Sequence, residues 1–211
     1  MVDHVAWLGH DSFRISGSKV VYIDPWHIAG GAPPADIVLV THDHYDHFNK
    51  SDIAKISGPA TVVVGPEEVT AQVRGETRSV APGDIVTIGG VTIRAVPAYN
   101  TDKFREPGVV FHPQADAKVG YVIEMDGTTY YHAGDTDVID EMSEIDVDVA
   151  LLPVSGTYVM TADEAARACD KIRAKVVVPM HYGTIVGTVA DAERLSALCP
   201  VPVTILAKSA P

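Results

Sequence analysis

The sequence predicts an α/β fold in a single domain that spans residues 1–211. The length suits one domain with a sizeable core. The first half alternates short β-branched runs with turn residues, and the second half places helical patterns between such runs. Several apolar runs also lead directly into His or Asp, which is typical of buried strands that deliver functional groups at their carboxyl ends.

The first half is predicted to consist mostly of strands. We expect strands at residues 5–8, 13–15, 20–23, 37–40, 61–64, 85–88 and 91–96. Two helices are expected at residues 51–56 and 67–73, and Pro66 suits the first turn of the second one. Residues 29–34 form a loop rich in Gly and Pro, and no linker or repeat divides the chain.

The second half is predicted to alternate strands and helices. We expect strands at residues 119–125, 128–131, 149–152, 175–178 and 203–206. The first two are joined by Asp126-Gly127, a strong signal for a tight turn. Thr161 and Glu164 form a capping box that opens a helix ending near residue 173, and a last helix covers residues 191–198.

Composition and charge exclude several classes of partner. Sixteen basic residues against twenty-eight acidic ones give a formal charge of −12, which should repel nucleic acid and anionic lipid. The longest apolar runs are strand-sized, so we expect a soluble, cytoplasmic protein without a membrane partner. Cys169 and Cys199 stand apart from any metal-binding pattern and are interpreted as small buried side chains. The sequence leaves open whether the chain forms a homo-oligomer.

The strongest functional signal is a group of potential metal ligands directly after the apolar run at residues 37–40. Residues 41–47 read Thr-His-Asp-His-Tyr-Asp-His, which places His42, His44, Asp46 and His47 within six positions. Packing needs no such group at a strand end, whereas neutral imidazoles and a carboxylate are ligands of zinc, manganese, iron or nickel. The segment is therefore predicted to bind metal.

Other strands end in the same kinds of residue. Asp24 follows the predicted strand 20–23, His132 and Asp135 follow strand 128–131, and His181 follows strand 175–178. If these strand ends converge, they build one site from residues far apart in the chain.

Together these motifs resemble the metallo-β-lactamase fold superfamily. The resemblance is carried by His-x-His-x-Asp-His at residues 42–47, Gly134-Asp135-Thr136, Met180-His181-Tyr182-Gly183 and Ile23-Asp24-Pro25. The Trp7-Leu8-Gly9-His10 opening points to its metal-dependent hydrolase branch, which is related to the ascorbate-phosphate lactonase type. The resemblance implies a four-layer αββα sandwich with a binuclear metal centre at one edge of two facing sheets.

The resemblance also implies a role for each motif residue. His42 and His44 would bind the first ion, Asp46, His47 and His181 the second, and Asp135 would bridge the two. Asp24 would orient one imidazole, against the alternative of a simple turn residue before Pro25.

One position departs from the family pattern. The superfamily usually supplies a third histidine to the first ion after a Pro-Ala-x element, and here Pro97-Ala98-Tyr99 is followed by Asn100. An amide oxygen is a poorer ligand for a transition metal, so the first position would be weaker or would take a harder ion such as manganese. His112 and His10 are the candidates to fill the gap, against the alternative of His112 as an exposed loop residue. His132 is expected to support or pack behind the site rather than to bind metal.

The predicted function is that of a metal-dependent hydrolase. Two divalent ions about 3.5–4 Å apart lower the pKa of a shared water to about 7 and so hold hydroxide at neutral pH. Asp46 is expected to position this water, and His10, His112 and Tyr99 are the candidates for protonating the leaving group.

The substrate is expected to be a small molecule. Lys103, Arg105 and Lys118 lie near His112 in the sequence and favour an anionic ester, lactone or phosphodiester, although they also suit a solvated loop. Two alternatives stay open: an iron-dependent redox protein and a metal-binding module without catalysis. The Asn100 departure is the best argument for the second.

Overall fold

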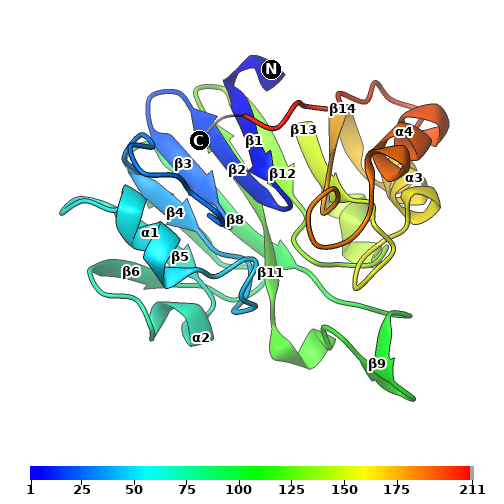
Figure 1. The fold of residues 1–211 in the computed structure, drawn as a ribbon, viewed down its shortest axis with the longest axis horizontal. Coiled ribbons are helices and arrows are strands. Elements are labelled where there is room, and N and C mark those ends of the chain that lie inside the picture. Colours follow the sequence, from blue (N-terminus) through cyan, green and yellow to red (C-terminus); the bar gives the residue numbers. More distant parts are fainter. Residues whose placement is uncertain (210–211) are drawn as a thin grey trace.

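Two six-stranded mixed sheets face one another in the computed structural model, which describes residues 1–209 (Figure 1). The first sheet has the order β1 (Val5–Gly9), β2 (Ser12–Ser16), β3 (Val20–Ile23), β4 (Ile37–Leu39), β5 (Val62–Gly65) and β6 (Glu76–Ser79). The second has the order β14 (Arg173–Met180), β13 (Asp146–Pro153), β12 (Thr128–His132), β11 (Val119–Met125), β8 (Val91–Pro97) and β7 (Ile85–Ile88). Strands β3 to β6 run parallel, as do β12 to β14, and the other neighbours in both sheets are antiparallel.

Alternation along the strands assigns side chains to two apolar layers. In β4, Ile37 and Leu39 point between the sheets, whereas Val38 faces outward and packs with Ile53 and Ile56 of helix α1 (Lys50–Ile56). Helices α1 and α2 (Glu67–Thr70) cover the outer face of the first sheet, and α3 (Ala162–Lys171) and α4 (Val189–Leu198) cover the second (Figure 1). This arrangement confirms the predicted four-layer αββα sandwich.

Short elements complete the chain. They are the 3-10 helices η1 (Val2–His4), η2 (Gln114–Asp116) and η3 (Asp140–Glu144), and the two-stranded sheet of β9 (Phe104–Glu106) and β10 (Val109–Val110). Among residues 1–209, no helix is both long enough and apolar enough to cross a bilayer.

Local sequence signals account well for the turns and caps. Asp126 and Gly127 have φ of 53° and 73°, and they join β11 to β12 with Met125 opposite Thr128, as a two-residue hairpin requires. The Thr161 side chain accepts a hydrogen bond from the Glu164 N–H, and the Glu164 carboxylate accepts one from the Thr161 N–H, which confirms the predicted capping box.

Some predicted boundaries are wrong. The helix expected at residues 67–73 ends at Thr70, and the one expected to reach residue 173 ends at Lys171, because Arg173 already begins β14. The strand expected at residues 203–206 is reduced to a single bridge between Val203 and Val177. Pro200 and Pro202 lack the N–H groups that a longer ladder needs. Strands β6, β9 and β10 were not predicted, since they are short and mostly exposed.

The fold brings several strand ends to one edge of the sandwich. The segments after β3 and β4 in the first sheet meet those after β12 and β14 in the second, and the turn between β1 and β2 lies beside them. The polar residues that follow these strands therefore share one site.

Candidate metal centre

The loop after β4 places three histidines and a carboxylate in a tight turn before α1. The N–H groups of His47 and Phe48 both donate to the His44 carbonyl, at 3.0 and 2.7 Å, which reverses the chain, and Asn49 then caps α1. His42 and His44 project to one side, with His42 Nε2 3.0 Å from His44 Nδ1. The His47 ring is fully buried, and its centroid lies 4.1 Å from that of His42.

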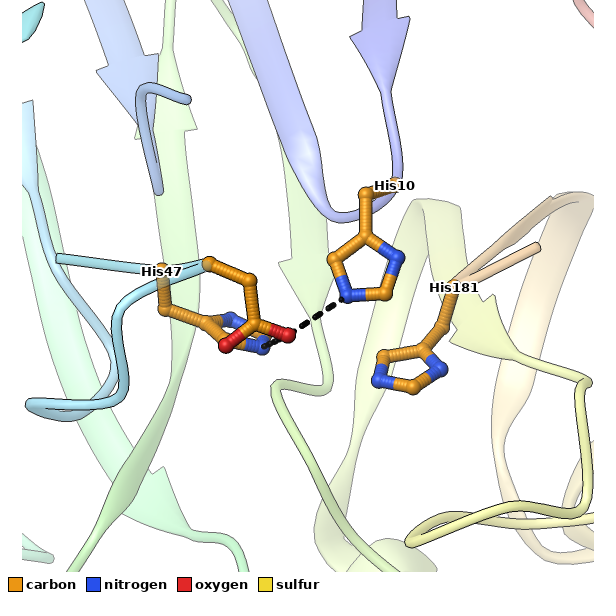
Figure 2. Close-up of side chains that lie close together, drawn as sticks. His10, His47 and His181 are labelled. Carbon is orange, nitrogen blue, oxygen red and sulfur yellow. Dashed lines mark hydrogen bonds and ion pairs between the residues drawn. The ribbon is translucent and has the colours of Figure 1, made fainter. Parts of the chain in front are cut away.

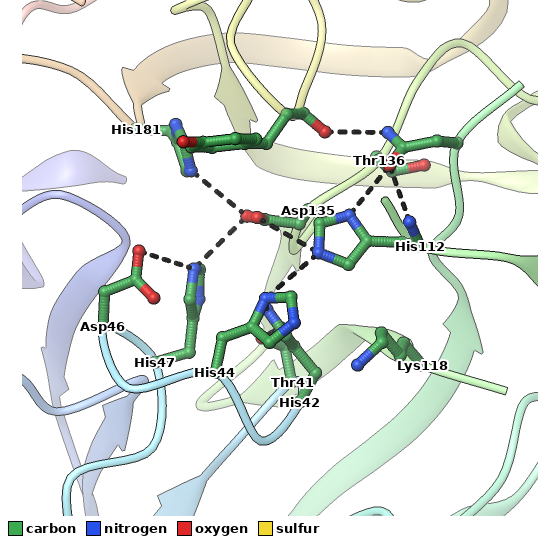
Figure 3. Close-up of polar contacts among 12 residues, drawn as sticks. Thr41, His42, His44, Asp46, His47, His112, Lys118, Asp135, Thr136 and His181 are labelled. Atoms are coloured by element: carbon green, nitrogen blue, oxygen red, sulfur yellow. Dashed lines mark hydrogen bonds and ion pairs between the residues drawn. The ribbon is translucent and has the colours of Figure 1, made fainter. Parts of the chain in front are cut away.

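His112 completes the first group of ligands. Its Nε2 atom lies 3.3 Å from His44 Nδ1, and the three rings of His42, His44 and His112 form one cluster (Figure 3). His112 is only 1% exposed, so it is no exposed loop histidine. It occupies the place next to His42 and His44 for which the sequence offered Asn100, His112 or His10.

Asn100 does not reach this cluster and instead holds His112. Its Oδ1 atom lies 3.0 Å from the backbone N of His112, which donates to it, and 2.9 Å from the ring Nδ1. Its amide nitrogen donates to the carbonyl of Tyr158 and to Asp137 Oδ1. The amide is 4% exposed, and all of its polar atoms are engaged by residues other than His42 and His44.

A second cluster forms around His47 and His181. Their Nε2 atoms lie 3.4 and 3.5 Å from Asp135 Oδ1, and Asp46 Oδ2 lies 3.9 Å from His47 Nε2. His10 comes from the β1–β2 turn. Its ring centroid lies 4.1 Å from that of His181, and its Nε2 atom lies 3.1 Å from Asp46 Oδ2 (Figure 2).

Asp135 lies between the two clusters. Its Oδ1 atom faces His47 and His181, and its Oδ2 atom is 3.7 Å from His112 Nε2 (Figure 3). Gly134, with φ of 64°, lets the chain turn sharply just before it. One carboxylate therefore presents one oxygen to each group of histidines.

Hydrogen bonds on the far side of the rings fix their orientation. Asp24 accepts from the backbone N and the hydroxyl of Thr41, and its Oδ2 atom lies 2.8 Å from His47 Nδ1. Thr41 Oγ1 lies 3.0 Å from His42 Nδ1, so Asp24 supports both clusters. Ser155 Oγ lies 2.9 Å from His181 Nδ1. Outer contacts of this kind hold ligating imidazoles in position.

His132 lies behind the site and binds the backbone. Gly134 N–H donates to its Nδ1 atom, so its Nε2–H donates to the Asp11 carbonyl at 2.9 Å. Both ring nitrogens are thus engaged, and neither points into the clusters.

The two clusters differ in charge. Burial lowers the pKa of His42 well below its ordinary value and the pKa of His112 to about 4. Burial alone would also lower the pKa of His47 and His181, but Asp135 and other nearby carboxylates raise both. Burial alone would raise the pKa of Asp135, yet His47 and His181 hold it well below its ordinary value. The imidazoles of the first cluster are therefore neutral, whereas in the second cluster imidazolium groups pair with carboxylates.

The atoms that face the centre fit a bound cation. His47 Nε2, His181 Nε2 and Asp135 Oδ1 are buried and have no hydrogen-bonding partner within the described residues. Buried polar atoms without partners are rare in folded proteins and call for an explanation such as an ion. Imidazole and carboxylate are also the donors that divalent transition metals prefer. The two clusters are able to bind metal.

Several residues of this region are not predicted from the sequence. Asp11, from the β1–β2 turn, lies with its Oδ2 atom 3.6 Å from His47 Nε2, and Ser155 and Thr41 hold ligand rings. A usable signal existed for Asp11 and Ser155, because both follow the end of a strand, as the predicted residues do. Asp137, which holds Asn100, carries no such signal.

Comparison with known proteins agrees with this geometry. A family model described as a beta-lactamase superfamily domain matches residues 4–181. A UPF0173 metal-dependent hydrolase of Methanoregula boonei is 37% identical over 198 residues, covering 90% of this chain and 86% of the relative. Another, of Pyrococcus abyssi, is 36% identical over 219 residues, covering 92% and 91%.

Solved structures show the same fold. A protein of Parabacteroides distasonis assigned as a metal-dependent hydrolase superposes with a TM-score of 0.83 at 31% identity, covering 95% of this chain and 91% of that one. Igni18, a metallo hydrolase of Ignicoccus hospitalis, superposes with a TM-score of 0.77 at 23% identity, covering 98% and 95%. The chain therefore belongs to the beta-lactamase superfamily, within the UPF0173 family of metal-dependent hydrolases.

Proposed function

We propose that this protein hydrolyses a small ester or lactone at a centre of two divalent metal ions. The observation that carries the proposal is the position of Asp135, whose two oxygens face two separate groups of histidines. When bound, a pair of ions supplies hydroxide at neutral pH and polarises the bond to be broken. Zinc, manganese, iron and nickel all suit donors of this kind.

The residues divide into two sets of ligands that share Asp135. His42, His44 and His112 would hold the first ion, and Asp46, His47 and His181 the second. In each set, the distances between ligand atoms given above are no more than 3.9 Å. Donors that each lie about 2 Å from one ion can be at most about 4 Å apart, and these pairs of ligand atoms meet that limit.

The surrounding residues would orient these ligands and position water. Asp24 and Ser155 would fix the rings of His47 and His181, and Asn100 would fix His112. Burial lowers the pKa of His10, which favours a neutral ring that donates Nε2–H to Asp46. This contact supports a role for His10 in aiming Asp46 at the reacting water.

A cavity of about 280 Å³ beside the clusters would receive the substrate. Its walls combine site residues with exposed or half-buried apolar groups, namely His44, Asp46, His112 and Asp135 with Tyr45, Phe111, Tyr158 and Ile185. Pockets of this kind recognise an apolar body by contact and its reactive group by a few polar atoms. We therefore propose a substrate with an apolar or aromatic group next to the scissile carbonyl.

The cations that favoured an anionic substrate are absent from the walls of this cavity. Lys103 pairs with Asp102, Asp137 and Glu164, and Lys118 Nζ lies 3.3 Å from Asp43 Oδ1. Arg105 is exposed on β9. The hydroxyl of Tyr99, a candidate proton donor, donates a hydrogen bond to Glu141 Oε2, and Tyr99 does not line the cavity. An anionic group would therefore meet no Lys or Arg side chain in the walls of this cavity.

Metal analysis combined with a substrate panel tests the proposal. We expect two ions per chain in protein purified without chelator, and turnover of an aromatic ester or lactone above that of a phosphorylated sugar lactone or a phosphodiester. Asp135→Asn should lose ion binding and lower turnover about 100-fold or more, because it loses the shared charge. Asp163→Asn, which changes an exposed carboxylate on α3, should leave both unchanged.

Other outcomes of the same experiment contradict the proposal. Two bound ions without turnover of any panel member would favour a metal-binding module. Bound iron with oxygen consumption and no hydrolysis would favour a redox protein. A single ion per chain would exclude the binuclear centre.

A further inference from the structure

A buried carboxylate with no assigned role lies against the second cluster. Asp11 follows the end of β1, and its side chain is fully buried. Neither of its carboxylate oxygens has a hydrogen-bonding partner among residues 1–209. An ionised carboxylate that is buried without a hydrogen bond or a counter-ion is strongly disfavoured, so an ionised Asp11 needs a positive charge close by.

The backbone around Asp11 is held firmly in place. Its carbonyl accepts a hydrogen bond from His132 Nε2 at 2.9 Å. The carbonyl of the preceding residue, His10, accepts from Trp7 Nε1 at 2.8 Å and from the His181 N–H at 3.2 Å. His10 itself has φ of 53°, a conformation that non-glycine residues rarely adopt. Two contacts from distant segments, with one from Trp7 of the adjoining strand, thus hold the turn that carries Asp11.

The carboxylate points at the free ring nitrogens of the second cluster. Asp11 Oδ2 lies 3.6 Å from His47 Nε2 and 3.9 Å from His181 Nε2. Asp135 Oδ1 lies 3.4 and 3.5 Å from the same two atoms. One ligand atom from each of these four residues can be chosen so that all lie within 4.8 Å of one another. The Asp11 distances are too long for hydrogen bonds, but they suit donors that share one ion.

We propose that Asp11 is a ligand of the second metal ion, an inference that rests on the binuclear centre proposed above. The second position then has three carboxylates, from Asp11, Asp46 and Asp135, with the imidazoles of His47 and His181. The first position has three imidazoles and one shared carboxylate. Carboxylate-rich sites suit manganese, whereas imidazole-rich sites suit zinc. The two positions therefore select different metals, and the second one takes the harder, oxygen-preferring cation.

Metal binding to Asp11→Asn tests this role without a substrate. Metal-free protein is first given one equivalent of Zn²⁺ and then titrated with Mn²⁺, and free Mn²⁺ is followed by electron paramagnetic resonance. We expect the substitution to weaken Mn²⁺ binding at least about tenfold. The Zn²⁺ affinity measured for the first equivalent should stay within about twofold, because Asp11 lies outside the cluster of His42, His44 and His112.

A matched control separates ligation from the general loss of a buried carboxylate. Asp52→Asn changes another buried aspartate, which pairs with Lys55 and accepts from the His27 N–H, away from the clusters. It should leave both metal affinities unchanged. If Asp11→Asn does not fold, the smaller Asp11→Ser replaces it, with circular dichroism of the metal-free protein as the check.

The outcomes distinguish this inference from the proposed function. Two ions bound by the wild type with unchanged Mn²⁺ affinity in a folded Asp11 variant would overturn the role of Asp11 and leave the binuclear centre intact. A wild type that binds one ion would overturn both. Equal loss of Mn²⁺ binding in Asp52→Asn would also overturn the inference, since it would show a general effect of buried charge.

Discussion

Replacing Asn100 by alanine should weaken the first metal position while leaving the second nearly unchanged. The Asn100 amide is the contact that fixes the His112 ring, with Oδ1 2.9 Å from His112 Nδ1 and 3.0 Å from the backbone N. Outer partners of ligating histidines typically contribute 10- to 100-fold to metal affinity. We therefore expect a loss of about 10- to 100-fold at the first position, which corresponds to roughly 1.4–2.8 kcal/mol.

The same substitution should lower the stability of the metal-free protein. Alanine leaves the Tyr158 carbonyl and the His112 N–H without their side-chain partner, whereas Asp137 keeps hydrogen bonds from the N–H groups of Thr101 and Asp102. Each buried group left unpaired costs about 1–3 kcal/mol. Two such groups give an expected loss of about 2–6 kcal/mol in the free energy of unfolding.

Calorimetric titration of metal-free protein with Zn²⁺, followed by urea unfolding in chelator, measures both effects. Asn49→Ala is the matched control, because it removes the cap of α1 at a cost of about 1 kcal/mol without touching His112. Unchanged Zn²⁺ affinity at the first position in Asn100→Ala would refute the positioning role. Equal weakening of both positions would refute the assignment of His112 to the first.

Three further predictions concern other parts of the site. Gly120→Ala should destabilise the protein by about 3 kcal/mol in urea unfolding, because the added Cβ atom would lie 2.6 Å from the His132 carbonyl oxygen. Gly58→Ala is the control and should be nearly neutral, because its added Cβ atom would have a single neighbouring atom, at 4.0 Å. Burial lowers the pKa of His112 from 6.5 to about 4, so the unfolded chain binds a proton at this residue more readily than the folded protein does. His112 therefore lowers the free energy of unfolding as the pH falls from about 6.5 to 4. The melting temperature of metal-free His112→Gln should therefore fall less than that of the wild type over this range, and an equal fall would contradict the assignment. His10→Phe should lower second-position affinity about 10- to 100-fold by removing the donor to Asp46, and normal affinity with a reduced kcat would instead indicate proton donation by His10.

Local patterns in the sequence determined most of the secondary structure and half of the site. The spacing of His42, His44, Asp46 and His47 lies within one turn, so no tertiary information is needed to bring them together. Period-two alternation places Ile37 and Leu39 between the sheets, and Asp126-Gly127 fixes its hairpin. The strand-end rule also pointed to Asp24, Asp135 and His181, which the fold brings to the same edge.

Only the tertiary structure decided which residues complete the two clusters. His112 lies in an irregular segment after β10, and its distance from His42 is set by the packing of the second sheet on the first and by its bonds to Asn100. Asp11 faces His47 because contacts from His132, Trp7 and His181 hold its turn. Such placements depend on contacts between segments up to about 170 residues apart along the chain, and no local pattern encodes them. The sequence by itself therefore specifies the metal-binding motif, and the packing of the two sheets specifies which outlying side chains reach it.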